Sequence, residues 1–208
     1  MLRITAALFI LCILAFSPSV SDAQLATQTV VCFGDSLTAG QGAAAGNAYP
    51  DFLRKALAQA GYHVAILNRG VSGDTTKDGQ ARLASILAAH PSVVLLEFGA
   101  NDGLRGQPVA GMTRNLSGMI ETLQHAHVHV LLLGMQLPPN LGPDYVQQFD
   151  SMYPQLATHY RLPLVPFLLK DVYGHDDLMS PDYIHPNGDG YVQVARNILP
   201  VLEPLLKK

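Results

Sequence analysis

Three residue types that can act together in nucleophilic catalysis lie at separated points of the chain. Ser36 follows a Gly-Asp pair, and Asp182 and His185 stand three residues apart near the C-terminus. A serine hydroxyl is a poor nucleophile until a base takes its proton, and an imidazole can accept and return a proton near neutral pH. One tight turn can place the Asp182 carboxylate against His185 Nδ1 and so fix the tautomer. The pattern predicts a triad of Ser36, His185 and Asp182 for acyl transfer.

Attack on an acyl carbonyl produces an oxyanion, which needs hydrogen-bond donors already in place. The backbone N–H groups of Ser36 and Gly73 and the side-chain amide of Asn101 are the expected donors. A glycine at position 73 lets its N–H approach the substrate without a side chain in the way. Loss of one such donor typically lowers the rate by about 10²–10³.

Each of these residues also has an ordinary structural explanation. Ser36 could cap a helix, Gly73 and Asn101 could belong to turns, and His185 could be a loop histidine before a proline. The structural explanations must then place a nucleophile, a base and two further donors together without a function. The combination favours an active site.

The elements that must position these residues alternate along the chain. Short apolar runs predict five strands, at residues 30–33, 63–67, 93–98, 128–133 and 164–167. Apolar residues at helical spacing predict helices within residues 52–60, 83–87, 116–123, 144–160 and 194–202. Strands that are apolar on consecutive positions are covered on both faces. The alternation therefore predicts a three-layer α/β/α sandwich, with a flavodoxin-like five-stranded parallel sheet.

Active sites of open parallel sheets form where the carboxyl ends of the strands meet their following loops. Ser36, Gly73 and Asn101 follow the first three predicted strands, and the Asp182–His185 segment follows the fifth. The four segments are therefore expected at one edge of the sheet.

The N-terminus has the pattern of a secretory signal peptide. A short positive start precedes an apolar run at residues 4–16, and small residues lead to a cleavage site after Ala23. The run is shorter than the roughly 20 residues of a membrane span, although an uncleaved anchor is the alternative. We expect a signal peptide at residues 1–23, one domain at residues 24–208, and an exported protein, periplasmic or secreted, with no membrane span after cleavage.

Charge and cysteine content narrow the possible partners. Cleavage removes one Arg and one Asp, so the formal net charge of -3 is unchanged, which gives no electrostatic basis for binding nucleic acid. Cys32 is the one cysteine of the predicted mature chain, so no intrachain disulfide is possible. Its apolar surroundings indicate a core position.

At its motifs the sequence resembles the SGNH (GDSL) hydrolases. The segment Gly34-Asp35-Ser36-Leu37 matches the first block, Gly73 the second, Asn101 the third, and Asp182 with His185 the last. The resemblance covers essentially the whole predicted mature chain. It implies an enzyme that hydrolyses carboxylic esters or thioesters, with no cofactor.

Segments 71–75 and 101–106 resemble the branch that contains bacterial thioesterase I, lysophospholipase L1 and arylesterases. This branch is typically exported and acts on acyl-thioesters, lysophospholipids and aryl esters. The chain departs from it at Ala100, Gln41 and Gln107, which weakens inference about the substrate more than about the catalytic residues.

Loop residues on the expected active edge are candidates for substrate binding. Arg105 could meet a phosphate or carboxylate of the substrate, or only solvent. The apolar candidates, which could instead simply pack the loops, are Leu104, Met135, Leu137, Pro138, Leu178 and Met179. They favour an apolar acyl group, whereas the absence of Trp argues against a carbohydrate platform. A carbohydrate O-acetylesterase and a non-enzymatic flavodoxin-like binding protein remain the alternatives.

Two weaker motifs suggest other chemistry. His125, His127 and His129 alternate in the sequence, but no carboxylate or Cys adjoins them, so we expect no metal site. Residues 40–42 resemble part of a dinucleotide loop but lack the full fingerprint, and no Walker-type Lys follows.

Overall fold

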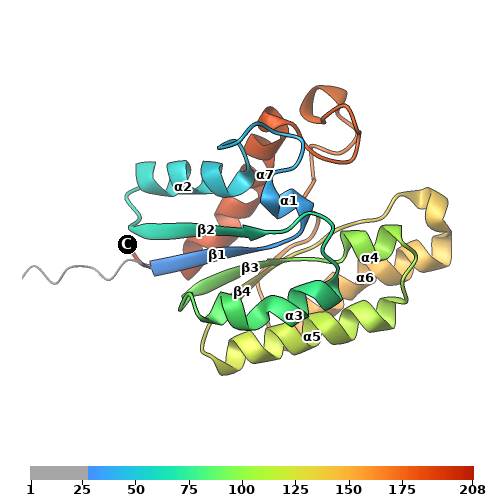
Figure 1. The fold of residues 1–208 in the computed structure, drawn as a ribbon, viewed down its shortest axis with the longest axis horizontal. Coiled ribbons are helices and arrows are strands. Elements are labelled where there is room, and N and C mark those ends of the chain that lie inside the picture. The colour runs from blue at the N-terminus through green and yellow to red at the C-terminus, as the bar shows by residue number, and fades with distance from the viewer. Residues whose placement is uncertain (1–27) are drawn as a thin grey trace, which may run out of the picture.

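The protein is described by a computed structural model over residues 28–208, and the expected signal peptide lies outside these residues. Five strands are present: β1 (Gln28–Gly34), β2 (Val64–Gly70), β3 (Val93–Glu97), β4 (His129–Leu133) and β5 (Leu164–Val165). All of their pairings are parallel, in the order β2-β1-β3-β4-β5 (Figure 1). The predicted five-stranded parallel sheet is therefore confirmed.

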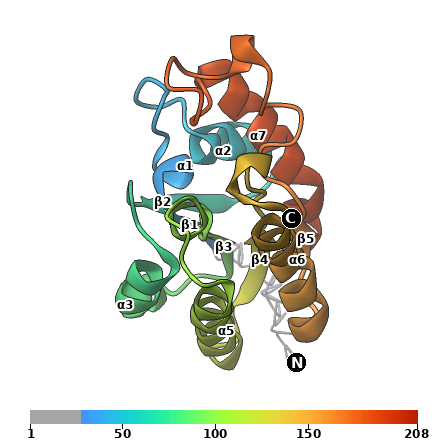
Figure 2. The same cartoon turned by 90° about the vertical axis from the view of Figure 1, so that its right-hand side faces the viewer.

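The helices form a layer on each face of this sheet, as Figure 2 shows most clearly. On one face lie α2 (Tyr49–Gln59) and α7 (Gly188–Leu202), and on the other lie α3 (Thr76–Leu87), α5 (Val109–His125) and α6 (Pro143–Tyr160). The connections also contain two short helices, α1 (Ser36–Ala39) and α4 (Ala100–Leu104), and two 3₁₀ turns, η1 (Pro139–Leu141) and η2 (Asp176–Leu178). A further 3₁₀ turn, η3 (Glu203–Leu205), directly follows α7. The α/β/α sandwich is thus confirmed.

The sequence prediction differs from the structure mainly at the ends of elements. The second strand begins at Val64 rather than His63 and continues to Gly70, while the fifth contains only two residues. Neither α1 nor α4 was expected, because helices of four or five residues carry no readable apolar period.

The centre of the sheet is the core of the molecule. All five residues of β3 are buried, as are the last five of β1. Helices on both faces explain why apolar residues occupy consecutive positions. Cys32 is fully buried in β1, and burial raises the pKa of its thiol to about 12, so it is the core residue that was predicted.

The register of the central strands brings their carboxyl ends level. Gly34, at the end of β1, pairs with Gly70 of β2 on one side and with Glu97 of β3 on the other. The segments that follow these three strands therefore start at the same height. Within residues 28–208, no helix combines the length and apolar character needed to cross a membrane.

Candidate active site

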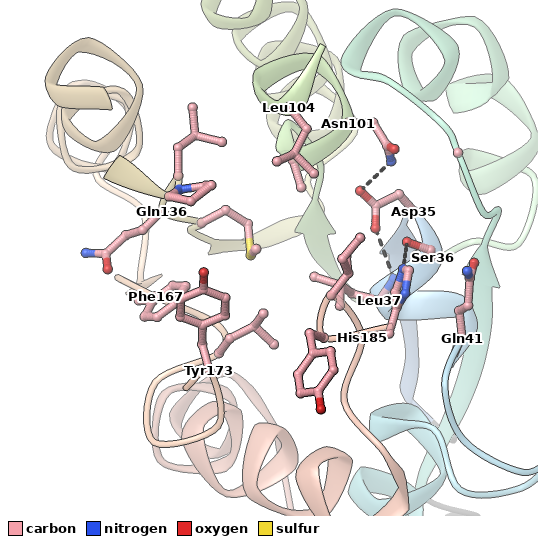
Figure 3. A pocket seen from close by; sticks show the side chains of 18 of the residues that line it. Asp35, Ser36, Leu37, Gln41, Asn101, Leu104, Gln136, Phe167, Tyr173 and His185 are labelled. Carbon is pink, nitrogen blue, oxygen red and sulfur yellow. Dashed lines mark hydrogen bonds between the residues drawn. The ribbon is translucent and has the colours of Figure 1, made fainter. Parts of the chain in front are cut away.

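The site lies where the chain changes direction across the sheet. Strands β1 and β3 are neighbours, but β1 continues to β2 on one side and β3 continues to β4 on the other. The loops after β1 and β3 diverge, which leaves a crevice of the kind that binds ligands in open α/β sheets. Ser36 follows β1 and Asn101 follows β3, and Figure 3 shows His185 approaching Ser36 in this crevice.

The turn after β1 presents the serine at the first position of α1. Asp35, rather than Ser36, is the N-cap, because its Oδ1 accepts the Leu37 N–H at 3.0 Å. The first N–H groups of a helix have no partner inside it. Ser36 therefore combines a side chain that faces the crevice with a backbone donor left over from the helix start.

Ser36, His185 and Asp182 form a continuous hydrogen-bonded row. Ser36 Oγ lies 2.9 Å from His185 Nε2, and His185 Nδ1 lies 2.6 Å from Asp182 Oδ2 (Figure 3 shows the first contact). The serine and the histidine are each 8% exposed. The predicted contact between the Asp182 carboxylate and Nδ1 is present, so a neutral imidazole that carries its proton on Nδ1 directs a free Nε2 at the serine.

A tight turn supports the carboxylate of Asp182. Its Oδ1 accepts the Ser180 hydroxyl at 2.7 Å and the N–H groups of Ile184 and His185, both at 2.9 Å. Partial desolvation opposes ionisation, but the hydrogen bonds from His185, Ile184 and Ser180 outweigh it and hold the pKa of Asp182 well below its usual range. The carboxylate is consequently ionised wherever the imidazole can act as a base.

The three expected oxyanion donors come together at the crevice, but they differ in whether they already donate a hydrogen bond. Within residues 28–208, neither the Ser36 N–H nor the Gly73 N–H is bonded to a backbone or side-chain acceptor. Gly73 has φ 87, a conformation that favours glycine. The Asn101 amide already donates to Asp35 Oδ2 and to the Asp74 carbonyl, each at 3.0 Å. Asn101 must therefore share or release one of these bonds to donate to a substrate oxygen.

An apolar cleft of about 430 Å³ opens beside the serine. Its apolar lining includes Leu104, Met135, Leu137, Pro138, Phe167, Leu169, Tyr173, Tyr183 and Ile184. Five large apolar side chains are exposed in the described part of the chain, and four of them, all except Val71, line this cleft. Exposed apolar surface is thus concentrated at the mouth of the site rather than scattered.

Comparison with known proteins agrees with this geometry. Residues 32–193 match the GDSL-like Lipase/Acylhydrolase family. The chain belongs to this family. It is 40% identical to Esterase TesA of Pseudomonas aeruginosa, over 88% of this chain and 92% of that protein. It is 36% identical to Thioesterase 1/protease 1/lysophospholipase L1 of Escherichia coli K12, over 87% of this chain and 86% of that protein.

A solved structure of TesA matches this GDSL-like hydrolase with a TM-score of 0.83 and 40% identity. The match covers 86% of this chain and 100% of the TesA chain. The likeness extends over the segments that carry Ser36, Gly73, Asn101 and His185, because the family match spans all of them. Family membership also removes the flavodoxin-like binding protein as an alternative.

Of the seven substrate-binding residues expected from the sequence, four line the cleft of this hydrolase: Leu104, Met135, Leu137 and Pro138. Leu178 and Met179 do not line it. Leu178 ends η2, and its carbonyl accepts the Asn187 N–H at 2.9 Å; Met179 is buried and pairs with Pro186 in a short antiparallel bridge. Both residues therefore hold the chain next to His185 rather than the substrate.

Arg105 also lies outside the cleft lining. Its Nη2 donates to the Gly73 carbonyl at 3.2 Å and to Asn101 Oδ1 at 3.4 Å. The guanidinium thus links two of the segments that provide oxyanion donors. A contact of Arg105 with a substrate phosphate or carboxylate, one of the two possibilities considered for it, stays a prediction.

Arg82, which no pattern in the sequence singles out, joins three segments under the site. Its Nε donates to Asp74 Oδ2 at 2.6 Å, its Nη1 to the Arg69 carbonyl at 2.8 Å and its Nη2 to the Gly34 carbonyl at 2.8 Å. The guanidinium also lies over the ring of Phe33, 4.5 Å from its centroid. Arg82 falls on the polar side of α3, so the sequence contained no signal that distinguished it from a solvated arginine.

Five apolar cleft residues between positions 167 and 184 were also not predicted from the sequence: Phe167, Leu169, Tyr173, Tyr183 and Ile184. Tyr183 and Ile184 stand between Asp182 and His185. Two apolar residues inside a catalytic turn were the available signal.

Proposed function

We propose that this GDSL-like hydrolase is a serine esterase that cleaves acyl esters through an acyl-Ser36 intermediate. One observation carries the proposal. Ser36 Oγ is 2.9 Å from an imidazole nitrogen whose partner nitrogen is 2.6 Å from a supported carboxylate, and this row opens into an apolar cleft. The activated nucleophile and the apolar surface that can bind an acyl chain therefore lie next to each other.

The reaction would proceed in two steps. His185 Nε2 takes the proton of the Ser36 hydroxyl as Oγ attacks the acyl carbonyl, and the negative charge moves to the carbonyl oxygen. The Ser36 and Gly73 N–H groups and the Asn101 amide would bind this oxygen. Collapse expels the alcohol or thiol, which receives the proton from His185. Water then attacks the acyl-Ser36 carbonyl by the same proton path and releases the acid.

The shape and lining of the cleft favour an acyl chain longer than acetyl. Its walls are largely apolar side chains, and its volume of about 430 Å³ lies in the range of small-ligand pockets. Relatives whose names include arylesterase, thioesterase and lysophospholipase support aryl esters, acyl-thioesters and lysophospholipids as substrate classes. A carbohydrate O-acetylesterase would leave most of this apolar surface unused.

A chain-length series tests this proposal. We expect kcat/KM on p-nitrophenyl esters and acyl-CoA thioesters to rise from acetyl to octanoyl. S36A should abolish turnover and labelling by a fluorophosphonate probe. Labelling of S36A, or turnover within tenfold of the parent, would show that another residue is the nucleophile. A preference for acetylated xylan over octanoyl esters would favour the O-acetylesterase instead.

We further propose that the protein is exported after cleavage between Ala23 and Gln24, based on the apolar run at residues 4–16 and the small residues before the site. Mass spectrometry of the protein from fractionated bacterial cells tests this. The expected form begins at Gln24 and lies outside the cytoplasm. An intact N-terminus in the cytoplasmic fraction would contradict export.

A further inference from the structure

Glu97 is a carboxyl group in the middle of the core. It is the last residue of β3, whose other residues are all apolar, and it is 0% exposed. Burial of a carboxyl group is costly unless its polar atoms are paired. The presence of a buried carboxyl group at this position therefore needs an explanation.

One oxygen of Glu97 holds the turn that carries the serine. Its Oε2 accepts the Asp35 N–H at 3.1 Å and the Thr38 hydroxyl at 2.8 Å, and Thr38 Oγ1 lies 2.9 Å from the Tyr49 hydroxyl. A Cβ at Gly34 would overlap both Glu97 Oε2 and Thr38 Oγ1. The glycine that begins the turn thus makes room for this carboxyl group.

The contacts continue from the turn to the oxyanion donor. Asp35, whose backbone is held by Glu97, uses Oδ1 to cap α1 at the Leu37 N–H and Oδ2 to accept the Asn101 amide. Figure 3 shows Asp35 between Asn101 and the Ser36 turn. A chain of contacts therefore runs from Glu97 through Asp35 to Asn101.

The two neighbouring carboxyl groups differ in charge. Within residues 28–208, neither makes a salt bridge with a cation. Burial, and next the negative charge of Asp35, raises the pKa of Glu97 well above its usual range. Burial raises the pKa of Asp35 only to about 6, because hydrogen bonds with Leu37, Glu97 and Asn101 and the nearby His185 favour its ionised form. The two shifts favour an ionised Asp35 beside a neutral Glu97.

We propose that Glu97 is a positioning residue for the oxyanion hole, which fixes the nucleophile turn directly and aligns the Asn101 amide through Asp35. Its Oε1 has no hydrogen-bond partner among the described residues and is the one buried side-chain oxygen or nitrogen found so there. A group placed only for stability would be expected to use both oxygens or to be apolar. Glu97 acts through other groups and does not touch the reacting atoms.

Two substitutions at position 97 separate charge from hydrogen bonding. E97Q has the shape of the neutral carboxyl group, and its amide oxygen can accept from the Asp35 N–H and the Thr38 hydroxyl. E97L removes both bonds at similar volume. E121Q provides a matched control, since Glu121 lies on the exposed face of α5 and bonds the Tyr160 hydroxyl. We would measure kcat and KM on p-nitrophenyl butyrate from pH 6 to 9, together with thermal unfolding.

We expect E97Q to keep kcat within about threefold and E97L to lose about tenfold or more in kcat, with KM changed less than threefold; complete loss of a donor costs more, about 10²–10³. E97Q cannot ionise, so its unfolding midpoint at pH 9 should exceed that of the parent. E97L with parental kcat would overturn the proposal, and so would E97Q as slow as E97L, because a charged carboxylate would then be required. If E97L does not fold, E97Q decides: a loss in kcat above tenfold, or a lower midpoint at pH 9, overturns it.

Discussion

Replacement of Asp182 by Asn isolates the function of one oxygen atom. In the structure, Oδ1 takes three hydrogen bonds from the turn, while Oδ2 takes only the Nδ1–H of His185. The amide oxygen of D182N can keep the three turn bonds. Its NH₂ group then faces Nδ1 and forces that nitrogen to accept. The imidazole must carry its proton on Nε2, directed at Ser36, where it cannot act as a base.

The size of the effect follows from this wrong tautomer. The corresponding Asp-to-Asn change in a serine protease triad lowers kcat about 10⁴-fold, which corresponds to about 5.4 kcal/mol. We expect a loss of about 10⁴ in kcat for D182N with its turn intact. D182A should also be slow, but it loses the three turn bonds as well. It should therefore unfold at a lower temperature than D182N.

The assay is kcat on p-nitrophenyl butyrate at pH 8, with thermal unfolding and ¹⁵N NMR of the histidine ring. The spectra should place the His185 proton on Nδ1 in the parent and on Nε2 in D182N. D177N, in the same loop, is the control, because the exposed Asp177 bonds Asn187 through its backbone carbonyl. If D182N retained more than a tenth of the parental kcat, the assignment of Asp182 as the residue that sets the tautomer would be refuted.

The remaining predictions concern the donors, the cleft, the support and the pH dependence. G73A places a side chain at φ 87 and should lower kcat by about tenfold or more. Y173A removes an apolar wall and should lower kcat/KM about fivefold on octanoyl esters and less on acetyl esters, which corresponds to about 1 kcal/mol of lost burial. R82K cannot reach three acceptors with one ammonium group and should destabilise the fold by about 1–3 kcal/mol in denaturant unfolding. Asp35 and Glu97 have raised pKa values when folded, so their contribution to stability is full below about pH 4 and is lost as pH rises through about 6 and beyond. The calorimetric unfolding midpoint should therefore fall between pH 5 and 8, less steeply in E97Q.

Specific results would contradict each of these expectations. If G73A had the same kcat as the parent, Gly73 would not be an oxyanion donor. An equal loss on acetyl and octanoyl esters in Y173A would mean that this side chain does not contact the acyl chain. An unchanged free energy of unfolding in R82K would show that the three hydrogen bonds of Arg82 do not contribute to stability. If the unfolding midpoints of the parent and E97Q changed equally with pH, Glu97 would not titrate on unfolding.

The sheet could be predicted from the sequence because its strands are covered on both faces. Four consecutive apolar residues at 93–96 and again at 130–133, in segments too short for a typical helix, favour buried strands. The ends of α6 agreed closely with prediction, since Pro143 begins the helix and an apolar stripe continues to Tyr160. The short α1 and α4 could not be foreseen. Four or five residues do not nucleate a helix alone, so these two depend on contacts made only in the folded protein.

The reactive groups of the site were predictable for a related reason. Parallel strands that end level must bring their following segments together, so residue type and position after a strand were sufficient for Ser36, Gly73 and Asn101. Which way a loop side chain faces is set by tertiary contacts. Met179 was therefore wrongly placed in the cleft and Tyr173 was missed. The contacts of Arg82 with Gly34 and of Glu97 with Asp35 join segments far apart in sequence, so no local pattern predicts them.

The turn from Asp182 to His185 couples catalysis to substrate recognition. Asp182 Oδ1 holds the N–H groups of Ile184 and His185, which closes the turn and leaves Tyr183 at φ 56. A non-glycine residue in this conformation is uncommon and needs support from its surroundings. The same geometry directs Tyr183 and Ile184 outward, 65% and 53% exposed, where they line the cleft. Because the carboxylate that orients the base also shapes this wall, D182A, which loses the three turn bonds, should alter acyl-chain preference as well as rate, whereas D182N, which keeps them, should lower only the rate.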